Sequence, residues 1–587
     1  MPGFVGFINE MQINNWTADC FTQLAGQKVS QWQELGCQVQ MNAQKTSIAH
    51  HNYSNDFFCV DIWGDVLSFD SSGFDDLFRI IEHALLSDEV ASFAKKLNGY
   101  FVISVLDKRN NTLTLINDRY GMKPLYIWSK DSLLYGFASE LKGIILHPKH
   151  QQQVDRSALE TFIDVGHFLG LETLFTDVKR MPPATVLTVS LTSGLMTKQR
   201  YWQWSEIGID KEIDFDHAID KAYELFDQAI KRALATCENK QLAITLSGGL
   251  DSRVLLAAAR QHFDGEIKTY TFGEQGCADA LIAAQVADFA GVDNQFTPID
   301  GQNWFDGREE GVWLTDGLKN VLHMHALSSV SSIATHSNYL LNGFLGDVTA
   351  GGSYLIANKA QTNLLDMATI RYGKHASKAL FDPDYFEGSS SDGVFIFNRG
   401  MRFISVGSDL LSNHLNNFKP FMDNDFVDFL YSLPQEMREN GRLYHHMLLK
   451  YYPDFFAEIP WQQTGKPISL ADSESYHAAS GLKQQLKNII RGSVVESVAR
   501  RLYRKLSKKH HYVAYDDWLR RPQFKEYTRQ LLLAEQAMLP TLLGRDKIEL
   551  ILQQFYSGKE DLKAETIGSL LTLEIYFKQL SLRKKTV

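Results

Sequence analysis

The stretch that decides the fold is Ser247-Gly248-Gly249-Leu250-Asp251-Ser252, which lies between a predicted strand and a predicted helix. Residues 242–246 before it are β-prone and bounded by polar residues, and residues 253–260 after it are strongly helical. Because glycine has no Cβ, backbone N–H groups at such a turn can close on phosphate oxygens, and the helix N-terminus adds its unpaired donors. These six residues therefore predict a pyrophosphate-binding loop, with Asp251 placed to hold a magnesium ion that bridges the phosphates.

Length and composition limit the classes of protein to consider. The chain has 587 residues, enough for two or three domains, and its 44% hydrophobic and 22% charged residues are typical of a soluble globular protein. A net charge of -10 argues against a protein that coats nucleic acid. We find no apolar run of transmembrane length, no signal peptide in residues 1–10, and no paired spacing among the five cysteines, so we expect a cytoplasmic protein.

The pattern of the chain changes twice. Residues 1 to about 205 contain many short β-prone runs, whereas from about 210 helical and β-prone segments alternate. This alternation predicts a parallel sheet with helices on both faces. Beyond about residue 360 the pattern is mainly helical.

Several short stretches of the N-terminal part occur together in one known family. They are Gly3-Phe4-Val5-Gly6, Leu97-Asn98-Gly99-Tyr100-Phe101, the run from Asn117 to Tyr126, the run from Phe137 to Lys142, and the segment from Leu174 through Pro183 to Trp202. In this order and spacing they resemble the amidotransferase domain of the asparagine synthetase B family of glutamine-dependent, amide-forming ligases. The resemblance extends over about residues 1–470.

The second half of the resemblance includes the phosphate loop. Its other landmarks are Asp279, Asn342-Gly343-Phe344-Leu345-Gly346-Asp347, Gly351-Gly352, Pro420-Phe421-Met422-Asp423, Leu433-Pro434 and Trp461. The resemblance implies that Asp347 shares magnesium with Asp251, and two carboxylates on two loops can satisfy an octahedral ion that keeps some waters. It also implies a set of ATP-binding residues: Leu246, Ser247, Gly248, Gly249, Asp251, Ser252, Phe272 and Gly346.

The fold that the resemblance implies is an α/β multidomain protein. We expect a class II glutamine amidotransferase-like domain in residues 1–205, built as an Ntn-hydrolase-like αββα sandwich. A synthetase domain in residues 206–475 would be an adenine-nucleotide α-hydrolase-like (PP-loop), doubly wound parallel sheet. Residues 476–587 would form a helical C-terminal extension.

The sequence departs from the family in the N-terminal domain. The family carries its glutaminase nucleophile at position 2, a cysteine exposed by removal of the methionine, but this sequence has Pro2. Proline has no thiol, so no thioester with glutamine can form. The glutamine-binding asparagine–glycine pair of the family is also replaced, because the equivalent residues read Trp63-Gly64-Asp65. We therefore expect no glutaminase activity.

Further departures lie in the second half. Val348 stands where the family usually has a glutamate that lines the acceptor side of the adenylate, and Tyr444-His445-His446 stands in place of a lysine-containing turn. Both changes suggest an acceptor other than aspartate. Lys466 lies two positions from the expected catalytic lysine, so it is either that residue, stabilising charge at the α-phosphate, or a surface lysine.

Two other features need an interpretation. His323 and His325 could suggest a metal pair, but alternate positions on a helix point to different faces, so we prefer a role in a substrate pocket or the core. Residues 483–509 carry nine Lys or Arg against one acid, Glu496, and their apolar positions recur at helical spacing. This segment is either a solvated helix packed on the body or a surface helix in peripheral contact with an anionic membrane or lipid-linked glycan.

These observations lead to one main hypothesis. We expect an ATP- and magnesium-dependent, AMP-forming ligase in which Asp251, Asp347 and Lys466 are catalytic. It would adenylate a carboxylate of a small molecule, glycan or peptide and pass the acyl group to ammonia or an amine. The alternatives are a cyclase similar to lasso-peptide cyclases or β-lactam synthetases, and a non-catalytic ATP-binding scaffold. The acceptor, the nitrogen donor and a homodimeric state stay open.

Overall fold

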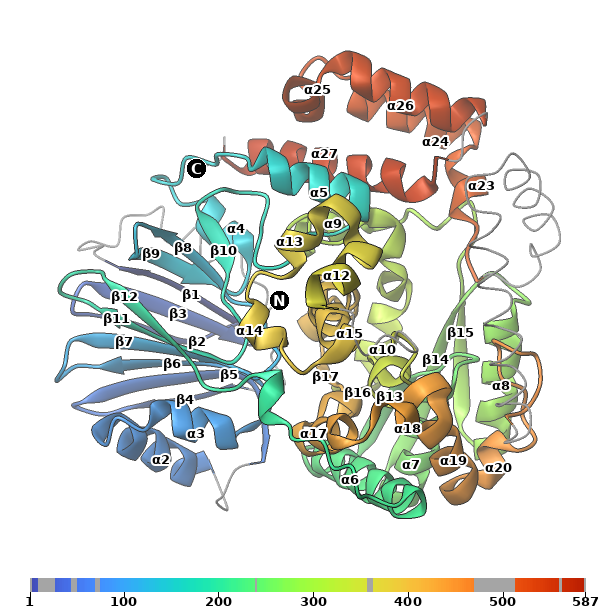
Figure 1. The fold of residues 1–587 in the computed structure, drawn as a ribbon. Helices are drawn as coiled ribbons and strands as arrows, with labels where there is room; N and C mark the ends of the chain where they lie inside the picture. Colours follow the sequence, from blue (N-terminus) through green and yellow to red (C-terminus); the bar gives the residue numbers. More distant parts are fainter. Residues whose placement is uncertain are drawn as a thin grey trace.

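The computed structural model describes residues 3–8, 27–43, 50–68, 74–237, 240–355, 363–468, 512–558 and 562–584. Figure 1 shows a sandwich of two sheets beside a parallel sheet with helices around it, and a group of C-terminal helices along one side of both. The mixed α/β architecture expected from the sequence is confirmed. The basic segment 483–509 and Pro2 lie outside the described residues.

The sandwich contains two six-stranded antiparallel sheets. The first has the order β10-β8-β9-β1-β3-β2, from strands β10 (Val178–Arg180), β8 (Tyr126–Lys130), β9 (Leu133–Ala138), β1 (Gly3–Ile8), β3 (Cys37–Ala43) and β2 (Gln27–Glu34). The second has the order β12-β11-β7-β6-β5-β4, from strands β12 (Met196–Arg200), β11 (Thr185–Ser190), β7 (Thr112–Asn117), β6 (Asn98–Asp107), β5 (Phe58–Ser68) and β4 (His50–Ser54).

Each sheet is buried on both faces. Phe4 and Val39 of one sheet meet Trp63 and Leu113 of the other in a shared core, because alternate residues of a strand point to opposite faces. The outer face of the second sheet packs on α2 (Phe74–Leu86) and α3 (Val90–Lys96). The outer face of the first packs on α4 (Leu141–Ile145) and α5 (Arg156–Val165). The order of layers is therefore helix, sheet, sheet, helix.

The parallel sheet positions the predicted phosphate loop. Its order is β15-β14-β13-β16-β17, from strands β15 (Asp293–Pro298), β14 (Glu266–Gly273), β13 (Gln241–Thr245), β16 (Tyr339–Leu341) and β17 (Asn416–Phe418), and every pairing is parallel. Helices α6 (Phe215–Ala235), α7 (Leu250–His262) and α8 (Ala278–Ala290) pack around it. The loops after β13, β14 and β16 therefore meet at one edge, where ligands of such sheets bind.

Most of the remaining chain up to residue 468 is helical. The helices are α9 (Arg308–Leu314), α10 (Val330–His336), α11 (Gly346–Thr349), α12 (Leu364–Tyr372), α13 (Ala376–Ala379), α14 (Pro383–Phe386), α15 (Ser390–Phe395), α16 (Ser405–Ser408), α17 (Asn424–Ser432), α18 (Gln435–Arg438), α19 (Arg442–Tyr451) and α20 (Pro453–Phe456). Short 3-10 turns η2 (Val321–His323) and η3 (His325–Ser329) lie between α9 and α10.

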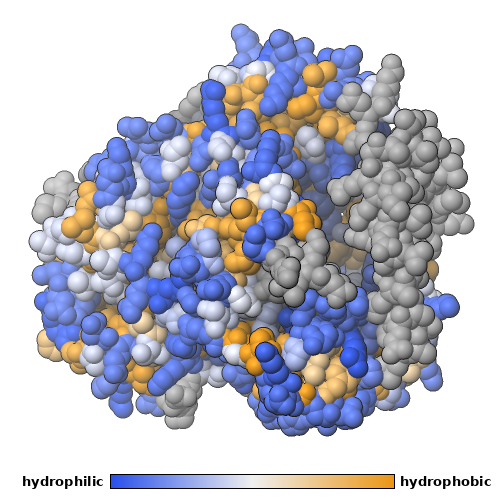
Figure 2. Space-filling model, in the orientation of Figure 1, coloured by the Kyte–Doolittle hydropathy of each residue, from blue (hydrophilic) through white to orange (hydrophobic). Residues whose placement is uncertain are grey.

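The described C-terminal residues form α23 (Tyr515–Leu519), α24 (Pro522–Leu532), α25 (Met538–Leu543), α26 (Arg545–Ser557) and α27 (Ala564–Lys584). Helix α27 packs against both α5 and α9, so it joins the sandwich to the parallel-sheet half (Figure 1). None of the helices described in the structure combines the length and apolarity needed to cross a bilayer. On the face that Figure 2 shows, apolar residues occur in small groups among polar ones.

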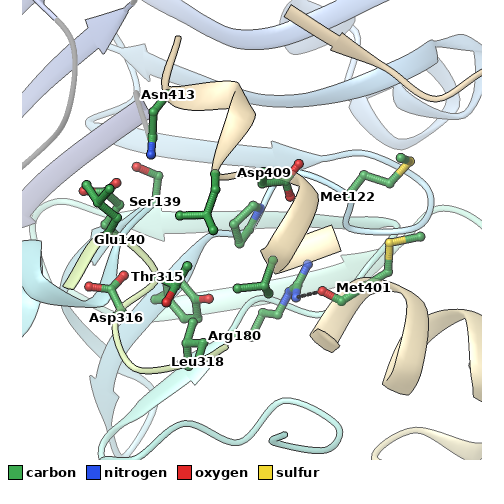
Figure 3. Close-up of a pocket in the computed structure, with 15 residues that line it drawn as sticks. Met122, Ser139, Glu140, Arg180, Thr315, Asp316, Leu318, Met401, Asp409 and Asn413 are labelled. Atoms are coloured by element: carbon green, nitrogen blue, oxygen red, sulfur yellow. Dashed lines mark hydrogen bonds between the residues drawn. The ribbon is translucent and has the colours of Figure 1, made fainter. Parts of the chain in front are cut away.

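A buried ion cluster also joins the two halves. The Lys142 ammonium lies 3.0 Å from Asp316 and 3.2 Å from Glu140, and all three side chains are almost fully buried. Asp316 also accepts hydrogen bonds from the backbone N–H groups of Leu141 and Lys142. Beside this cluster, residues of both halves face a cavity of about 20 Å³, which is large enough for one water but not for a substrate (Figure 3).

Candidate active site

The predicted phosphate loop is formed as a strand–turn–helix between β13 and α7. Its serines close the turn: the Ser247 N–H donates to the Ser252 hydroxyl over 3.0 Å, and the Gly249 N–H donates to the Ser247 hydroxyl over 3.2 Å. The Gly248 N–H donates to the Asp279 carboxylate over 2.9 Å. The loop is thus held in shape by its own serines and by Asp279 of α8, and it leads into the N-terminus of α7.

The structure brings Asp251 and Asp347 together, although 96 positions separate them in the chain. The Asp347 N–H donates to one Asp251 oxygen over 2.8 Å, and the Tyr444 hydroxyl donates to the other over 3.0 Å. The Ser353 hydroxyl donates to Asp347 over 3.0 Å. Two carboxylates therefore lie on two loops, each oriented by a hydroxyl group.

The loop after β16 approaches Asp251 closely. A Cβ atom at Gly346 would lie 2.6 Å from the Asp251 carboxyl carbon, so only glycine fits at this position. Leu345 before it has φ 62 and ψ 19, a left-handed conformation that is strained for leucine. This strained turn starts α11 so that the Asp347 N–H points at Asp251.

The electrostatics of the pair follow from its burial. Burial, together with the charge of Asp347, raises the pKa of Asp251 from its usual 3.8 to about 8. Burial also raises the pKa of Asp347, although the hydrogen bond from Ser353 opposes this shift. Two like charges held together in this way favour either a shared proton or a bound cation.

These groups line a cleft of about 980 Å³. The predicted residues Leu246, Ser247, Gly249, Ser252 and Phe272 line it with the two carboxylates. Among the described residues that line the cleft there are three aspartates and neither lysine nor arginine. In the described part of the chain, no group of three or more His, Cys, Asp or Glu side chains is arranged around a common metal position.

Lys466 is not among the described residues that line the cleft. It is exposed at the end of a turn that begins at Trp461, closed by the Trp461 N–H donating to the Lys466 carbonyl over 2.8 Å. Gln462 and Gln463 of the same turn line the cleft, and the Gln462 N–H donates to the Gly248 carbonyl over 3.1 Å. The catalytic role of Lys466 stays a prediction.

Sequence reasoning missed the residue that anchors the phosphate loop. Arg253 is fully buried, and its guanidinium donates to the carbonyl groups of Ile459 and Pro460 over 3.0 and 2.7 Å, and to those of Phe455 and Gly248 over 3.2 and 3.5 Å. Burial lowers its pKa to about 10. An arginine directly after the loop, in an otherwise apolar helical run, was the available signal.

Three aromatic rings that line the cleft contact one another. Phe272 stacks on His325 with ring centroids 5.8 Å apart, and Tyr512 lies edge-on to Phe272 at 6.5 Å. All three residues line the cleft. His325 therefore has the pocket position considered from the sequence, whereas the His323 ring packs on Phe403 at 5.0 Å. Tyr512, which sequence reasoning missed, comes from the C-terminal region.

In the sandwich, the corner at the start of β1 is closely packed. A Cβ atom at Gly3 would lie 2.3 Å from the Ser139 hydroxyl oxygen and 3.3 Å from the Trp63 ring. The Trp63 indole packs edge-on to Phe4 at 6.3 Å, and the Lys123 ammonium lies 5.4 Å from its ring centroid. All the described cysteines are buried, and Cys37 pairs with Ile8 at the other end of β1.

Comparison with known proteins accounts for both halves. A glutamine amidotransferase domain matches residues 83–202, and an asparagine synthase domain matches residues 221–388. Together the two matches support an asparagine synthetase-like family for this chain. The phosphate loop and Asp347 both lie within the asparagine synthase match, and Gly3 lies outside the amidotransferase match.

Individual relatives of this asparagine synthetase-like chain cover only parts of it. Asparagine synthetase [glutamine-hydrolyzing] 3 of Bacillus subtilis is 34% identical over 174 residues, 29% of this chain and 27% of the relative. Asparagine synthetase [glutamine-hydrolyzing] of Bos taurus is 24% identical over 389 residues, 64% of each chain. The chain therefore spans less than two thirds of these relatives. A glutamine phosphoribosylpyrophosphate amidotransferase structure from B. subtilis matches with a TM-score of 0.25 and 10% identity, covering 52% of this chain and 92% of that one.

Proposed function

We propose that this asparagine synthetase-like protein is an ATP-dependent, AMP-forming ligase that adenylates a carboxylate and passes the acyl group to ammonia or an amine. One observation carries the proposal: Asp251 and Asp347 meet across two loops, at the mouth of a preformed glycine loop on a helix N-terminus. The asparagine synthase domain and the relatives support an ATP-dependent amide ligase at the coarser level. We also propose that residues 1–205 form an Ntn-hydrolase-like domain, that residues 206–475 form a PP-loop synthetase domain, and that residues 476–587 form a helical C-terminal extension.

The reaction would proceed in two steps. The substrate carboxylate attacks the α-phosphorus of ATP, the bond to the β,γ-phosphates breaks, and pyrophosphate leaves into the loop of residues 247–252. The N–H groups in the first turn of α7 would receive its negative charge, since those of Ser247, Gly248 and Gly249 already donate to other groups. The amine then attacks the acyl carbon and AMP leaves. The adenylate would have to be kept from water, which would otherwise hydrolyse it.

The donor set of the pair fits magnesium. Carboxylate oxygens are the hard ligands that Mg²⁺ prefers, and the described residues that line the cleft include neither lysine nor arginine. Asp251 and Asp347 would hold the ion, which would neutralise the phosphate charge. Tyr444 and Ser353 would keep the two carboxylates oriented, because each hydroxyl already donates to one of them.

We further propose that the amidotransferase-like half does not hydrolyse glutamine. Pro2 supplies no thiol, and Trp63 fills the space next to Gly3. Among the described residues of the sandwich, no other cysteine replaces the missing nucleophile, because Cys37 and Cys59 are buried in its shared core. The nitrogen would then come from free ammonia or from an amine substrate.

The acceptor carboxylate is proposed not to be aspartate. Val348 is 1% exposed and packs in the large core, so it supplies no carboxylate to the cleft, and the Tyr444 hydroxyl is committed to Asp251. The acceptor class stays a small-molecule, glycan or peptide carboxylate.

Pyrophosphate exchange tests the proposal directly. The full chain is incubated with ATP, magnesium, labelled pyrophosphate and a panel of amino-acid, sugar-acid and peptide carboxylates. Label entering ATP with one class of carboxylate is the expected result, and omission of that carboxylate is the control. No exchange with any member, in a protein that binds ATP normally, would favour the scaffold alternative.

A further inference from the structure

Four polar side chains form a hydrogen-bonded chain that ends in the cleft. Arg308 of α9 donates to the Tyr515 hydroxyl of α23 over 2.9 Å. The Tyr515 oxygen lies 2.8 Å from Nδ1 of His325, and Nε2 of His325 lies 3.2 Å from the Tyr512 hydroxyl oxygen. His325 and Tyr512 line the cleft, whereas Arg308 and Tyr515 are not among its described lining residues.

The chain has a defined direction. A guanidinium can only donate, so the Tyr515 oxygen accepts from Arg308, and we place its single proton on the side of Nδ1 of His325. His325 is neutral, because burial and the charge of Arg308 hold its pKa well below 6.5. A neutral imidazole carries one N–H, which is then on Nε2 and donates to the Tyr512 oxygen.

The Tyr512 proton is therefore left for a ligand. In the described part of the chain, the bond with His325 is the one side-chain hydrogen bond of the Tyr512 hydroxyl. The residue is fixed in place, since its carbonyl accepts from the Glu274 N–H over 2.8 Å at the end of β14. Its ring and those of Phe272 and His325 form three flat aromatic walls around one end of the cleft.

We propose that the Tyr512 hydroxyl donates a hydrogen bond to a ring nitrogen of the nucleotide base and thereby selects adenine, with Arg308, Tyr515 and His325 as positioning residues. The inference rests on the proposed function, because it assigns the aromatic end of the cleft to the base of ATP. With the phosphates on the loop after β13, the base extends towards Phe272 on the neighbouring strand β14. Adenine presents an acceptor at N1, whereas guanine presents an N–H there, which a directed hydroxyl proton opposes.

Nucleotide affinity of the full chain tests the proposal by calorimetry with ATP and GTP at saturating magnesium. Tyr512→Phe should weaken ATP binding about tenfold and leave GTP binding unchanged, because one buried hydrogen bond is lost. Tyr515→Phe should have the same effect, since His325 can then carry its proton on Nδ1 and accept from Tyr512. Tyr527→Phe is the matched control, because its hydroxyl bonds Glu309 away from the cleft.

The proton position on His325 gives a readout that packing alone would not change. In protein labelled with ¹⁵N-histidine, the His325 signals, assigned by their loss in His325→Asn, should report the Nε2–H tautomer and shift to Nδ1–H in Tyr515→Phe. An Nδ1–H tautomer in the wild type, or unchanged ATP affinity in Tyr512→Phe, would overturn this inference alone. Failure of the wild type to bind ATP would overturn the proposed function together with it.

Discussion

The parallel-sheet half and the sandwich half differ in how much space lies beside their candidate functional residues. We call the first the open half and the second the filled half. Next to the phosphate loop, charged and polar side chains face a cleft of about 980 Å³. At the start of β1, the Trp63 ring and Ser139 fill the corresponding space so closely that Gly3 has no room for a Cβ atom. Both halves nevertheless keep complete apolar cores. Resemblance to a family therefore follows core packing, whereas activity depends on a few polar groups and on open space.

The largest expected effect concerns the open half. Asp251→Asn should reduce pyrophosphate exchange on the order of a thousand-fold or more, because it keeps size but removes a charge from the cation site. Asp347→Asn should behave in the same way. Asp288→Asn, on the exposed side of α8, is the matched control and should be neutral. If both cleft variants keep full exchange at saturating magnesium, the two-carboxylate site is wrong.

The filled half should show no turnover of glutamine. Incubation of the wild type with glutamine should release no glutamate above a blank, and Pro2→Cys alone should not restore release because Trp63 occupies the neighbouring space. The double variant Pro2→Cys/Trp63→Asn separates the missing thiol from the missing space. Glutamate release by the wild type would contradict the proposal that the sandwich half does not hydrolyse glutamine.

The next prediction concerns the acceptor carboxylate of the open half, which we expect not to be aspartate. With ATP, magnesium, ammonium and aspartate, we expect no asparagine at an ordinary enzymatic rate, since Val348 is buried and supplies no carboxylate. The products are measured by chromatography of asparagine together with AMP. Turnover on the order of 1 per second or more would mean that the protein makes asparagine, the reaction for which its relatives are named, and would contradict this prediction.

A smaller effect tests whether the two halves unfold together. Lys142→Met leaves the buried carboxylates of Glu140 and Asp316 without their cation, and such a change typically costs about 3–5 kcal/mol. We expect one calorimetric transition at a lower temperature. Lys95→Met is the control, because its ion pair with Glu206 is half exposed and is worth less than about 1 kcal/mol. Two separate transitions would mean that the halves fold independently.

The sequence predicts best what is local. The strand, glycine turn and helix around Asp251 are consecutive, so the sequence alone predicted this strand–turn–helix, and the alternation after residue 210 predicted the parallel sheet. The phosphate-binding role of the turn stays a prediction. Asp347 was found through resemblance, because its partner is distant in the chain. Tyr444 was noted only as part of a departure from the family, and Tyr512 carries no pattern, since both reach the cleft through the packing of α19 and of the C-terminal region.

Arg253 has a consequence for how the phosphate loop responds to its ligand. A single guanidinium gathers the carbonyl oxygens of Gly248, Phe455, Ile459 and Pro460, much as a structural metal ion gathers its ligands. The loop and the chain entering the Trp461 turn are consequently one mechanical unit that is ordered before nucleotide arrives. If the loop binds nucleotide as proposed, little conformational entropy is left to be lost, and we expect the loop to act as a rigid receptor. Lysine, with three donors around a point charge, could not hold four carbonyl groups in this planar arrangement.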